Sequence, residues 1–319
     1  MDYREAAAFL RAHDNYLIIT HKRPDGDAIG CSVALAELLR AMGKTAWLLP
    51  SLDATDLFTE YLEGQNAPEG FVPDTVVSVD MAGLGLLPPN GEPWRNAIDL
   101  AIDHHPSNEG FAARTCLEGD KAACGEILYR IAGELGVMNR TIADALYVAV
   151  STDTGCFVYS NVTPNTHRVA AALMEAGADY RRLNKKHFRT KTMARMKLES
   201  LILRDMRLYH GGAVAVAPIS LDMMARAGAT ENDAEDIAAF VGQIQGVRHS
   251  ATIRELKPGE CKISLRTAAD LNASHTCARL GGGGHAAAAG CTVHGTVEEA
   301  ERAIVGAIDA QLAGDGANG

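Results

Sequence analysis

The 319-residue sequence lacks features that define several protein classes. No apolar run approaches the ~20 residues that a membrane-spanning helix needs, and Met1 to Glu5 shows no secretory signal, so we expect no membrane partner. The seven cysteines include no Cys-x-x-Cys pair, which disfavours a thiolate zinc site and indicates reduced, buried thiols in a cytoplasmic protein. A P-loop is excluded because Leu38 stands where its first glycine must be, and no Gly-x-Ser-x-Gly elbow occurs.

Basic residues are fewer than acidic ones. Thirty Lys and Arg against forty Asp and Glu leave a net charge of −10 at pH 7, and the densest basic stretch is 181–186. A protein that binds long nucleic acid usually carries a basic face, so we do not expect extended duplex binding. A small anionic ligand, held by a few placed groups or by metal, remains open, and the excess acids can serve partly as metal ligands.

Apolar β-type runs alternate with helical patterns in the first half of the chain. Strands are expected at 16–20, 45–49, 75–79 and 100–102, and helices at 28–42, 125–135, 141–150 and 164–174. The last helix has a clear start, with Thr163 as its N-cap and Pro164 at its first position. The alternation predicts an α/β fold with a mainly parallel sheet flanked by helices.

The second half shows a different pattern. Residues 181–207 are polar and contain no Gly or Pro, which predicts one long helix that connects two domains. A smaller α/β domain is expected beyond it, from strands at 213–217, 250–255, 262–266 and 291–294 and helices at 232–244, 273–280 and 297–312. The Gly-rich tail 313–319 is expected to be disordered. We therefore predict a first domain over 1–185, a connector helix over 186–210 and a second domain over 211–319.

A loop of acids and a histidine follows the first expected strand. His21, Asp25 and Asp27 supply one nitrogen and two carboxylates there, and Gly26 lets the loop fold sharply. In open α/β sheets, ligands bind beyond the carboxyl ends of the strands, which is where this loop lies. The alternative is a polar turn in which Asp27 caps a helix. An EF-hand is excluded because the alternating acids and the closing Glu are missing.

Three further groups hold possible ligands, two at the ends of expected strands and one after an expected helix. Asp80 ends the third strand, Asp103-His104-His105 ends the fourth, and Asp153 follows an apolar helix. Each also has a plain structural interpretation: Asp80 as a cap or turn residue, the Asp-His-His run as a polar strand end, and Asp153 as part of a helix-to-loop turn. A histidine that binds a metal usually has an acid or a carbonyl holding its other nitrogen, which suits the Asp-His-His run.

These groups together make an oxygen-rich ligand set with two imidazoles and no thiolate. Such ligands suit Mn²⁺ or Mg²⁺. Two ions about 3.5–4 Å apart that share a carboxylate are typical of sites that hydrolyse phosphate esters. The candidate metal ligands are His21, Asp25, Asp27, Asp80, His104 and Asp153.

A glycine-rich segment marks the second domain. Gly281, Gly282, Gly283 and Gly284 precede His285, and four glycines let backbone N–H groups approach an anion closely. A flexible linker is the alternative. In the alternating run 263–266, Ser264 and Arg266 share one strand face, where Arg266 is a candidate for binding phosphate or is simply a surface residue.

The ordered set of motifs resembles the DHH phosphoesterase family, with a glycine-rich segment like that of the DHH-associated C-terminal domain. The resemblance covers almost the whole chain. It implies a metal-dependent hydrolase of phosphate esters, and the chain length resembles the NrnA type, which acts on very short RNA and on 3′-phosphoadenosine 5′-phosphate. It also implies two divalent cations, Mn²⁺ first, with Mg²⁺ or Co²⁺ as alternatives, and it leaves a homodimer open.

The resemblance also assigns roles. His21, Asp25 and Asp80 hold one ion, and Asp80 bridges to the second. Asp27, His104 and Asp153 complete that second site. His105 faces the scissile phosphate or the leaving group, and Asp103 supports the histidines. Arg266 and the segment from Gly281 to His285 hold the terminal phosphate and nucleotide, with Ser264 on the same strand face.

Alternative functions remain on the sequence alone. One is hydrolysis of the linear dinucleotide pApA or of cyclic di-AMP, and another is a RecJ-like exonuclease acting on single strands. A non-catalytic nucleotide-binding protein on the same scaffold is a further alternative, which the loss of a ligand would favour. All six candidate ligands are present, so we expect an enzyme that prefers di- to pentanucleotides over long RNA.

Overall fold

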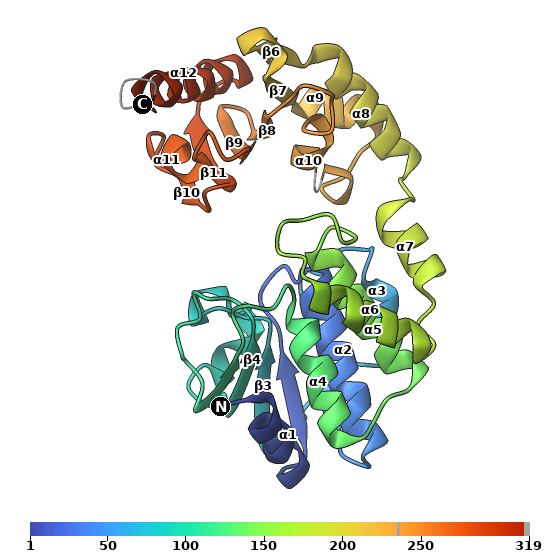
Figure 1. Cartoon of the computed structure of the whole chain (residues 1–319). Coiled ribbons are helices and arrows are strands. Elements are labelled where there is room, and N and C mark those ends of the chain that lie inside the picture. Colours follow the sequence, from blue (N-terminus) through green and yellow to red (C-terminus); the bar gives the residue numbers. More distant parts are fainter. Residues whose placement is uncertain (235–236, 316–319) are drawn as a thin grey trace. The chain divides into compact units, whose positions relative to one another are not determined.

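The computed structural model describes residues 1–234 and 237–315. The chain divides into two units, Met1–Thr190 and Lys191–Gly319 (Figure 1). Each unit has its own sheet and its own hydrophobic core. In the described part of the chain, no helix has the length and apolar character needed to cross a membrane.

A parallel sheet of five strands forms the centre of the first unit. Its order is β2-β1-β3-β4-β5, and every neighbouring pair is parallel. All residues of β1, β3 and β4 are buried, as is typical of parallel strands covered on both faces. The predicted mainly parallel sheet is confirmed. The strands are β1 Tyr16–Ile19, β2 Ala46–Leu48, β3 Thr75–Val79, β4 Leu100–Asp103 and β5 Arg114–Leu117.

The two faces of this sheet are covered differently. Ile18 and Val77 point into a core shared with the long helices, whereas the alternate residues Leu17 and Val76 pack with Leu87 and its neighbours from a segment of 3₁₀ turns. Figure 1 shows α2, α4, α5 and α6 gathered on one side of the strands. The helices are α1 Tyr3–Ala12, α2 Gly26–Ala41, α3 Thr59–Leu62, α4 Cys124–Leu135, α5 Arg140–Asp153, α6 Pro164–Glu175 and α7 Tyr180–Phe188, and the turns are η1 Leu84–Leu86 and η2 Pro89–Trp94.

The predicted single connector helix is wrong. The structure has two helices here, α7 and α8 (Met193–Asp205), separated by residues 189–192. Thr192 has extended backbone and its side chain accepts a hydrogen bond from the Arg195 amide, so it is the N-cap of α8. Thr favours an N-cap over a helix interior, because its hydroxyl can pair with the free amides of the first turn. A polar segment without Gly or Pro can still contain such a cap.

The second unit contains a mixed sheet with the order β10-β11-β9-β8-β7-β6. β7 and β8 are parallel and the other pairs are antiparallel. Val214 and Val216 of β7 face the core under α11 and α12, and Ala215 and Ala217 face the core under α8, α9 and α10. The strands are β6 Arg207–Tyr209, β7 Val214–Ile219, β8 His249–Lys257, β9 Glu260–Thr267, β10 Gly283–Gly284 and β11 Ala288–His294. The remaining helices are α9 Leu221–Ala227, α10 Ile237–Val241, α11 Ala273–Ala278 and α12 Val297–Asp315, with turns η3 His210–Gly212 and η4 Asn232–Ala234.

Some boundaries differ from the predictions. The helix expected over 232–244 is the short turn η4 followed by α10, and residues 235–236 lie outside the described residues. The last helix continues to Asp315, which contradicts the expected disorder of 313–315, and residues 316–319 lie outside the described part of the chain. The elements that were not predicted are α1, α3, α9, β5, β6 and β10. β5 and β6 have exposed residues, so the apolar run that marks a buried strand is missing from their sequences.

Candidate metal centre

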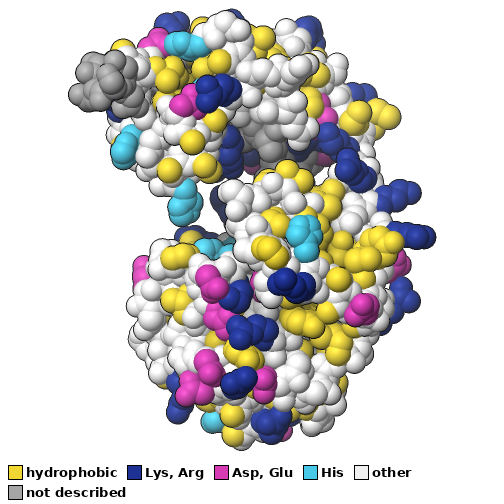
Figure 2. Space-filling view, in the orientation of Figure 1, with side chains coloured by type: hydrophobic (Ala, Val, Ile, Leu, Met, Phe, Trp, Pro, Cys, Tyr) yellow, Lys and Arg dark blue, Asp and Glu magenta, His cyan; other side chains and the backbone are white. Residues whose placement is uncertain are grey.

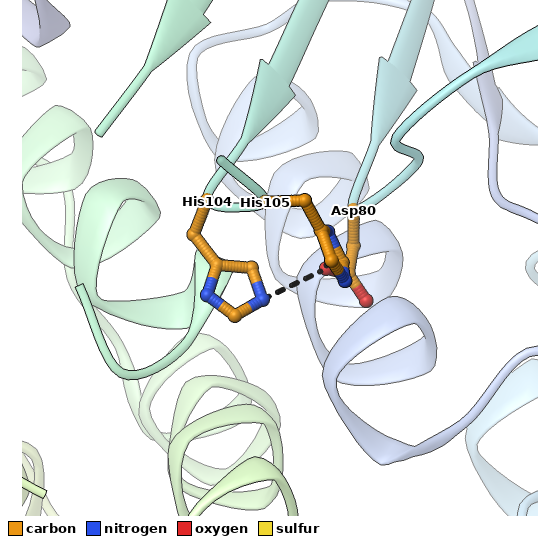
Figure 3. A group of neighbouring side chains, drawn as sticks. All are labelled: Asp80, His104 and His105. Atoms are coloured by element: carbon orange, nitrogen blue, oxygen red, sulfur yellow. Dashed lines mark ion pairs between the residues drawn. The ribbon is translucent and has the colours of Figure 1, made fainter. Parts of the chain in front are cut away.

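The carboxyl ends of β1, β3 and β4 bring the predicted ligands together. His21 follows β1, Asp80 follows β3 and His104 follows β4. The Nε2 atom of His104 lies 3.5 Å from Asp80 Oδ1 (Figure 3). The Nε2 atom of His21 lies 3.9 Å from Asp80 Oδ2. Three groups of side chains have ligand atoms within 4.8 Å of one another, and each could hold an ion: His21, Asp25 and Asp80; Asp27, His104 and Asp153; and Asp80, His104 and His105.

Asp80 is at the centre of this arrangement. It is 2% exposed, and its backbone adopts φ 55°, a left-handed conformation that is uncommon for a residue other than Gly. Its amide donates to the Ile102 carbonyl of the neighbouring strand at 3.0 Å, which holds this backbone in place. Its Oδ1 atom is buried and accepts no hydrogen bond from any residue that the structure describes. A buried carboxylate oxygen without a donor is costly, so its position favours a bound cation.

The first turn of α2 supplies Asp25 and Asp27. Asp25 is the N-cap, and its Oδ1 atom accepts the amides of Asp27 and Ala28 at 3.0 and 3.1 Å. Its remaining oxygen leaves it able to bind an ion, and its side chain is 62% exposed. Gly26 does not provide the sharp turn that we predicted, because it has no left-handed φ. It is needed for another reason: a Cβ there would collide with the side chain of Thr152 on α5.

Asp27 is oriented by the start of α4. Its Oδ2 accepts the Cys124 amide at 2.6 Å, and its Oδ1 accepts the Gly125 amide at 3.0 Å and the Cys31 thiol at 3.1 Å. The two amides belong to a helix N-terminus, where a negative charge is favoured. Asp27 Oδ2 is 3.8 Å from His104 Nε2, so the same carboxylate also faces the centre.

Asp153 is the last residue of α5 rather than a loop residue. Its Oδ2 atom lies 3.6 Å from His104 Nε2. The side chain is 29% exposed, so this edge of the centre remains open to solvent. α5 brings Asp153 close to Asp27 because α2 and α5 pack tightly, with Gly30 of α2 against the Ala145 carbonyl of α5.

Backbone carbonyls select the tautomers of two histidines. His21 Nδ1 lies 2.8 Å from the carbonyl oxygen of Lys22. His104 Nδ1 lies 3.1 Å from the carbonyl oxygen of Lys121. A carbonyl can only accept, so Nδ1 carries the proton in both rings. Their Nε2 lone pairs therefore point toward the carboxylates, as a metal ligand requires.

His105 has a different environment. Its Nδ1 lies 2.8 Å from Asp103 Oδ1, and Asn108 Nδ2 donates to Asp103 Oδ2 at 2.7 Å. Burial raises the pKa of Asp103, but the hydrogen bonds from His105 and Asn108 outweigh it, so the pKa lies below its usual value. The hydrogen bond to Asp103 raises the pKa of His105, against the opposing effect of burial. His105 therefore holds its proton more firmly than an ordinary histidine.

The buried carboxylates repel one another. Burial, followed by the charge of neighbouring carboxylates, raises the pKa of Asp80 and of Asp27 well above the usual value. Burial also raises the pKa of Asp153, with His104 opposing the shift. Divalent cations would neutralise these charges and give the free Asp80 oxygen a partner. The donor set of carboxylates and imidazoles thus fits such ions.

The second unit holds the other predicted residues. Ser264 and Arg266 lie on β9, as predicted, and Arg266 is exposed. The glycine segment is no linker, because Gly283 and Gly284 form β10 and pair with β11. A Cβ at Gly284 would lie 2.6 Å from the Ala288 carbonyl oxygen, so this glycine is required for strand packing, whatever it binds. His285 lies exposed in the turn that follows.

Several groups at the centre were not predicted. The side chain of Asn108, the carbonyl of Lys121 and the amides of Cys124 and Gly125 orient the ligands. Backbone groups leave no mark in a single sequence. Asn108 is polar and follows a polar run, so its type does not distinguish it from a loop residue.

Known proteins resemble this chain over most of its length. The model of the DHH family N-terminal domain matches residues 15–150, and that of the DHHA1 domain matches residues 211–314. The bifunctional oligoribonuclease and PAP phosphatase NrnA of Thermus thermophilus is 31% identical over 315 residues, which cover 97% of this chain and 94% of that protein. The protein of the same name from Bacillus subtilis is 25% identical over 311 residues, 92% of this chain and 94% of the relative.

A solved structure shows the same fold. The exopolyphosphatase-related protein from Bacteroides fragilis superposes with a TM-score of 0.84 at 22% identity, covering 97% of this chain and 96% of that one. The family resemblance inferred from the motifs is confirmed by the matching domain models and by the Thermus relative. This chain belongs to the DHH family and carries a DHHA1 domain.

Proposed function

We propose that the chain is a metal-dependent phosphoesterase that hydrolyses short oligoribonucleotides (nanoRNA) and 3′-phosphoadenosine 5′-phosphate. The observation that carries the proposal is the buried Oδ1 atom of Asp80, which accepts no hydrogen bond from the described residues and lies beside His104 and His105. The substrates follow from the Thermus and Bacillus relatives, which bear the names oligoribonuclease and PAP phosphatase.

Two divalent cations, Mn²⁺ first and Mg²⁺ or Co²⁺ next, fit the ligand chemistry. His21, Asp25 and Asp80 would hold one of them. Asp27, His104 and Asp153 would hold the second, with Asp80 shared. Bound cations of this kind supply Lewis acidity, lower the pKa of water and neutralise charge on phosphate oxygens.

His105 would act on the substrate itself. Asp103 Oδ1 lies 2.8 Å from Nδ1 of His105 and accepts its proton in a hydrogen bond. The other ring nitrogen, Nε2, therefore points away from Asp103. In the doubly protonated ring, that Nε2 can donate to a phosphate oxygen or to the leaving oxygen. Stabilising the charge that develops there is the contribution that a positioned cationic donor makes to phosphoryl transfer. Asp103 acts through His105 and is a positioning residue.

Residues of the second unit would bind the rest of the nucleotide. We propose that Arg266 binds the terminal phosphate through its planar guanidinium group. Ser264 lies two residues away on the same strand, and Gly282, Gly283, Gly284 and His285 would contact the same end of the substrate. His285 is exposed and can donate to an anion.

Short substrates suit the charge of this chain. On the face shown in Figure 2, Lys and Arg side chains of the first unit are interspersed with Asp and Glu side chains. Long single strands are usually bound along a positively charged groove. We therefore propose that a few placed groups bind the ends of short oligonucleotides, in a cytoplasmic enzyme whose seven cysteines are free thiols. A homodimer remains part of the proposal, as the family resemblance implies.

A substrate panel tests the proposal. Turnover would be measured with Mn²⁺ on RNA of two, three, five, ten and twenty nucleotides, on 3′-phosphoadenosine 5′-phosphate, on pApA and on cyclic di-AMP. We expect the highest kcat/KM on RNA of two to five nucleotides, phosphate release from 3′-phosphoadenosine 5′-phosphate, and no turnover in EDTA. Equal activity on the twenty-nucleotide strand would indicate a RecJ-like exonuclease, and a preference for cyclic di-AMP would indicate a cyclic dinucleotide phosphodiesterase.

A further inference from the structure

A turn with unusual backbone follows the end of α5 (Figure 1, the light green loop). Gly155, Cys156 and Phe157 adopt φ values of 55°, 57° and 67° in succession. The left-handed region is unfavourable for residues with a Cβ, and two such residues in a row are costly. Backbone of this kind persists only where its surroundings enforce it, and it gathers at functional sites. The turn begins two residues after Asp153.

Hydrogen bonds to Thr154 and a ring contact hold the turn in this shape. The carbonyl of Thr154 accepts the amides of Val158 and Tyr159 at 2.9 and 3.1 Å, and its hydroxyl accepts the Phe157 amide at 3.2 Å. The Phe157 ring stacks on His167 with the ring centroids 5.4 Å apart. These contacts fix the direction in which the next two side chains leave the backbone.

Those two side chains are apolar and open to solvent. Val158 is 80% exposed and Tyr159 is 55% exposed. A Cβ at Gly155 would collide with the Tyr159 ring, so one part of the ring packs on the Gly155 backbone. Asn161 Nδ2 donates to the Asp153 carbonyl at 3.1 Å, which ties the far side of the turn to the end of α5. An aromatic ring is thus held against Gly155, two residues after a candidate metal ligand, in a residue with about half of its surface accessible.

We propose that the Tyr159 ring stacks on a nucleobase of the substrate whose phosphate is bound at the metal centre. This inference rests on the proposed function, because it requires a nucleotide substrate. A nucleobase is one ribose away from the phosphate that is cleaved, and the Tyr159 ring packs on Gly155, two residues after Asp153, so we place the ring within reach of that base. Stacking tolerates any base because each has a π face, and a tyrosine already held on a rigid turn loses little conformational freedom. Tyr159 thus selects nucleotides over simple phosphate esters.

Kinetics on matched dinucleotides test this proposal. The substrates are ApA and two analogues in which one or the other adenine is replaced by hydrogen. For Tyr159→Ala we expect KM for ApA to rise about ten-fold or more while kcat changes less than about two-fold, since stacking stabilises substrate and transition state alike. The effect should disappear with the analogue that lacks the stacked base. Tyr159→Phe should restore the KM, whereas Tyr159→Leu, which keeps apolar bulk without a π face, should not.

A binding experiment separates this inference from the proposed function. The probe is a dinucleotide with 2-aminopurine and a non-hydrolysable methylene-phosphonate linkage, whose fluorescence falls when the base stacks. Quenching that Tyr159→Ala abolishes supports stacking even if the wild-type protein cleaves no nucleotide, in which case only the proposed function fails. Normal turnover of ApA with an unchanged KM in Tyr159→Ala, or rescue by Tyr159→Leu, overturns the stacking proposal. Val72→Ala, which trims a 76% exposed side chain before β3, controls for loss of surface apolar area.

Discussion

The two units expose their candidate residues to different degrees. In the first, Asp27, Asp80 and Asp103 are almost fully buried, and Asp27 and Asp103 are fixed by several hydrogen bonds. In the second, Arg266 and His285 are exposed. Burying several carboxylates creates a local need for positive charge, which bound cations meet. Exposed donors such as Arg266 and His285 create no local need for positive charge, and they can bind ligands of different lengths. We therefore propose that the chemistry lies in the first unit, and that Arg266 and His285 of the second unit bind the part of the substrate that does not react.

Sheet topology explains part of this difference. In the parallel sheet of the first unit, the strand ends that carry His21, Asp80 and His104 all lie at one edge, so they converge without long loops. Most strand pairs in the second unit are antiparallel, and its candidates come from a strand face and a tight turn. The substitutions below test whether chemistry and selection divide between the units in this way.

Asp80→Asn should have the largest effect. Loss of the shared carboxylate should lower kcat/KM roughly a thousand-fold or more, as expected when two ions lose a common ligand. The same change removes a buried charge, so the metal-free protein should unfold at a higher temperature than the wild type. Turnover with Mn²⁺ and thermal unfolding in EDTA measure the two effects. Asp74→Asn, an exposed acid before the same strand, is the control, and full activity of Asp80→Asn would exclude the shared-ligand role.

His105→Asn should lower kcat by about 10²–10⁴-fold, the usual contribution of a positioned acid or base. Asp103→Asn should lower the activity less than His105→Asn at low pH. At high pH it should change the pH at which activity is lost. The Asp103 carboxylate raises the pKa of His105, so its removal lowers that pKa, and activity should fall at a lower pH than in the wild type. The pH–rate profile measures this shift. An unchanged alkaline limb would mean that His105 is not the titrating group.

Arg266→Ala should act on binding alone. We expect KM for dinucleotides to rise about ten-fold with kcat nearly constant, because the guanidinium group would contact a part of the substrate that does not react. Arg266→Lys should recover only part of the loss, since an ammonium cannot make the paired contact. Mn²⁺ affinity, measured by calorimetry without substrate, should not change. A large fall in kcat would break the proposed division between the units.

The smallest effect concerns the pH dependence of stability without metal. Asp27 and Asp80 have pKa values raised above the usual value of 3.8, so the folded protein binds more protons than the unfolded chain once the pH exceeds about 4. The stability of the metal-free protein should therefore fall as the pH rises from that value toward neutrality. Unfolding temperatures in EDTA between pH 5 and pH 8 measure the slope. Mn²⁺ should stabilise the protein more at pH 8 than at pH 5, and a slope that Asp80→Asn leaves unchanged would contradict this explanation.

Sequence patterns predicted the candidate metal ligands better than the residues that orient them. Asp80 and His104 could be placed because a buried parallel strand has a clear apolar pattern and its end marks the ligand edge. Asn108 could not, because its importance depends on the Asp103 oxygen that it meets in space. The interruption between α7 and α8 was not predicted, because it depends on the hydroxyl of one N-cap residue, Thr192. The absence of Gly and Pro does not reveal such a cap. Gly26 was recognised, but its reason, the close approach of Thr152, requires knowing that α5 packs there.

The close packing of α2 and α5 has a consequence for ion selectivity. Asp27 and Asp153 belong to these two helices, and the helices touch through Gly26 and Gly30, where little side chain is present that could adjust. The two helix backbones therefore have little room to shift where they carry Asp27 and Asp153. Ca²⁺ needs ligands at about 2.3–2.6 Å and prefers more of them than Mg²⁺, whose ligands lie at about 2.0–2.1 Å. A centre whose two helices cannot move apart should therefore favour the smaller ion.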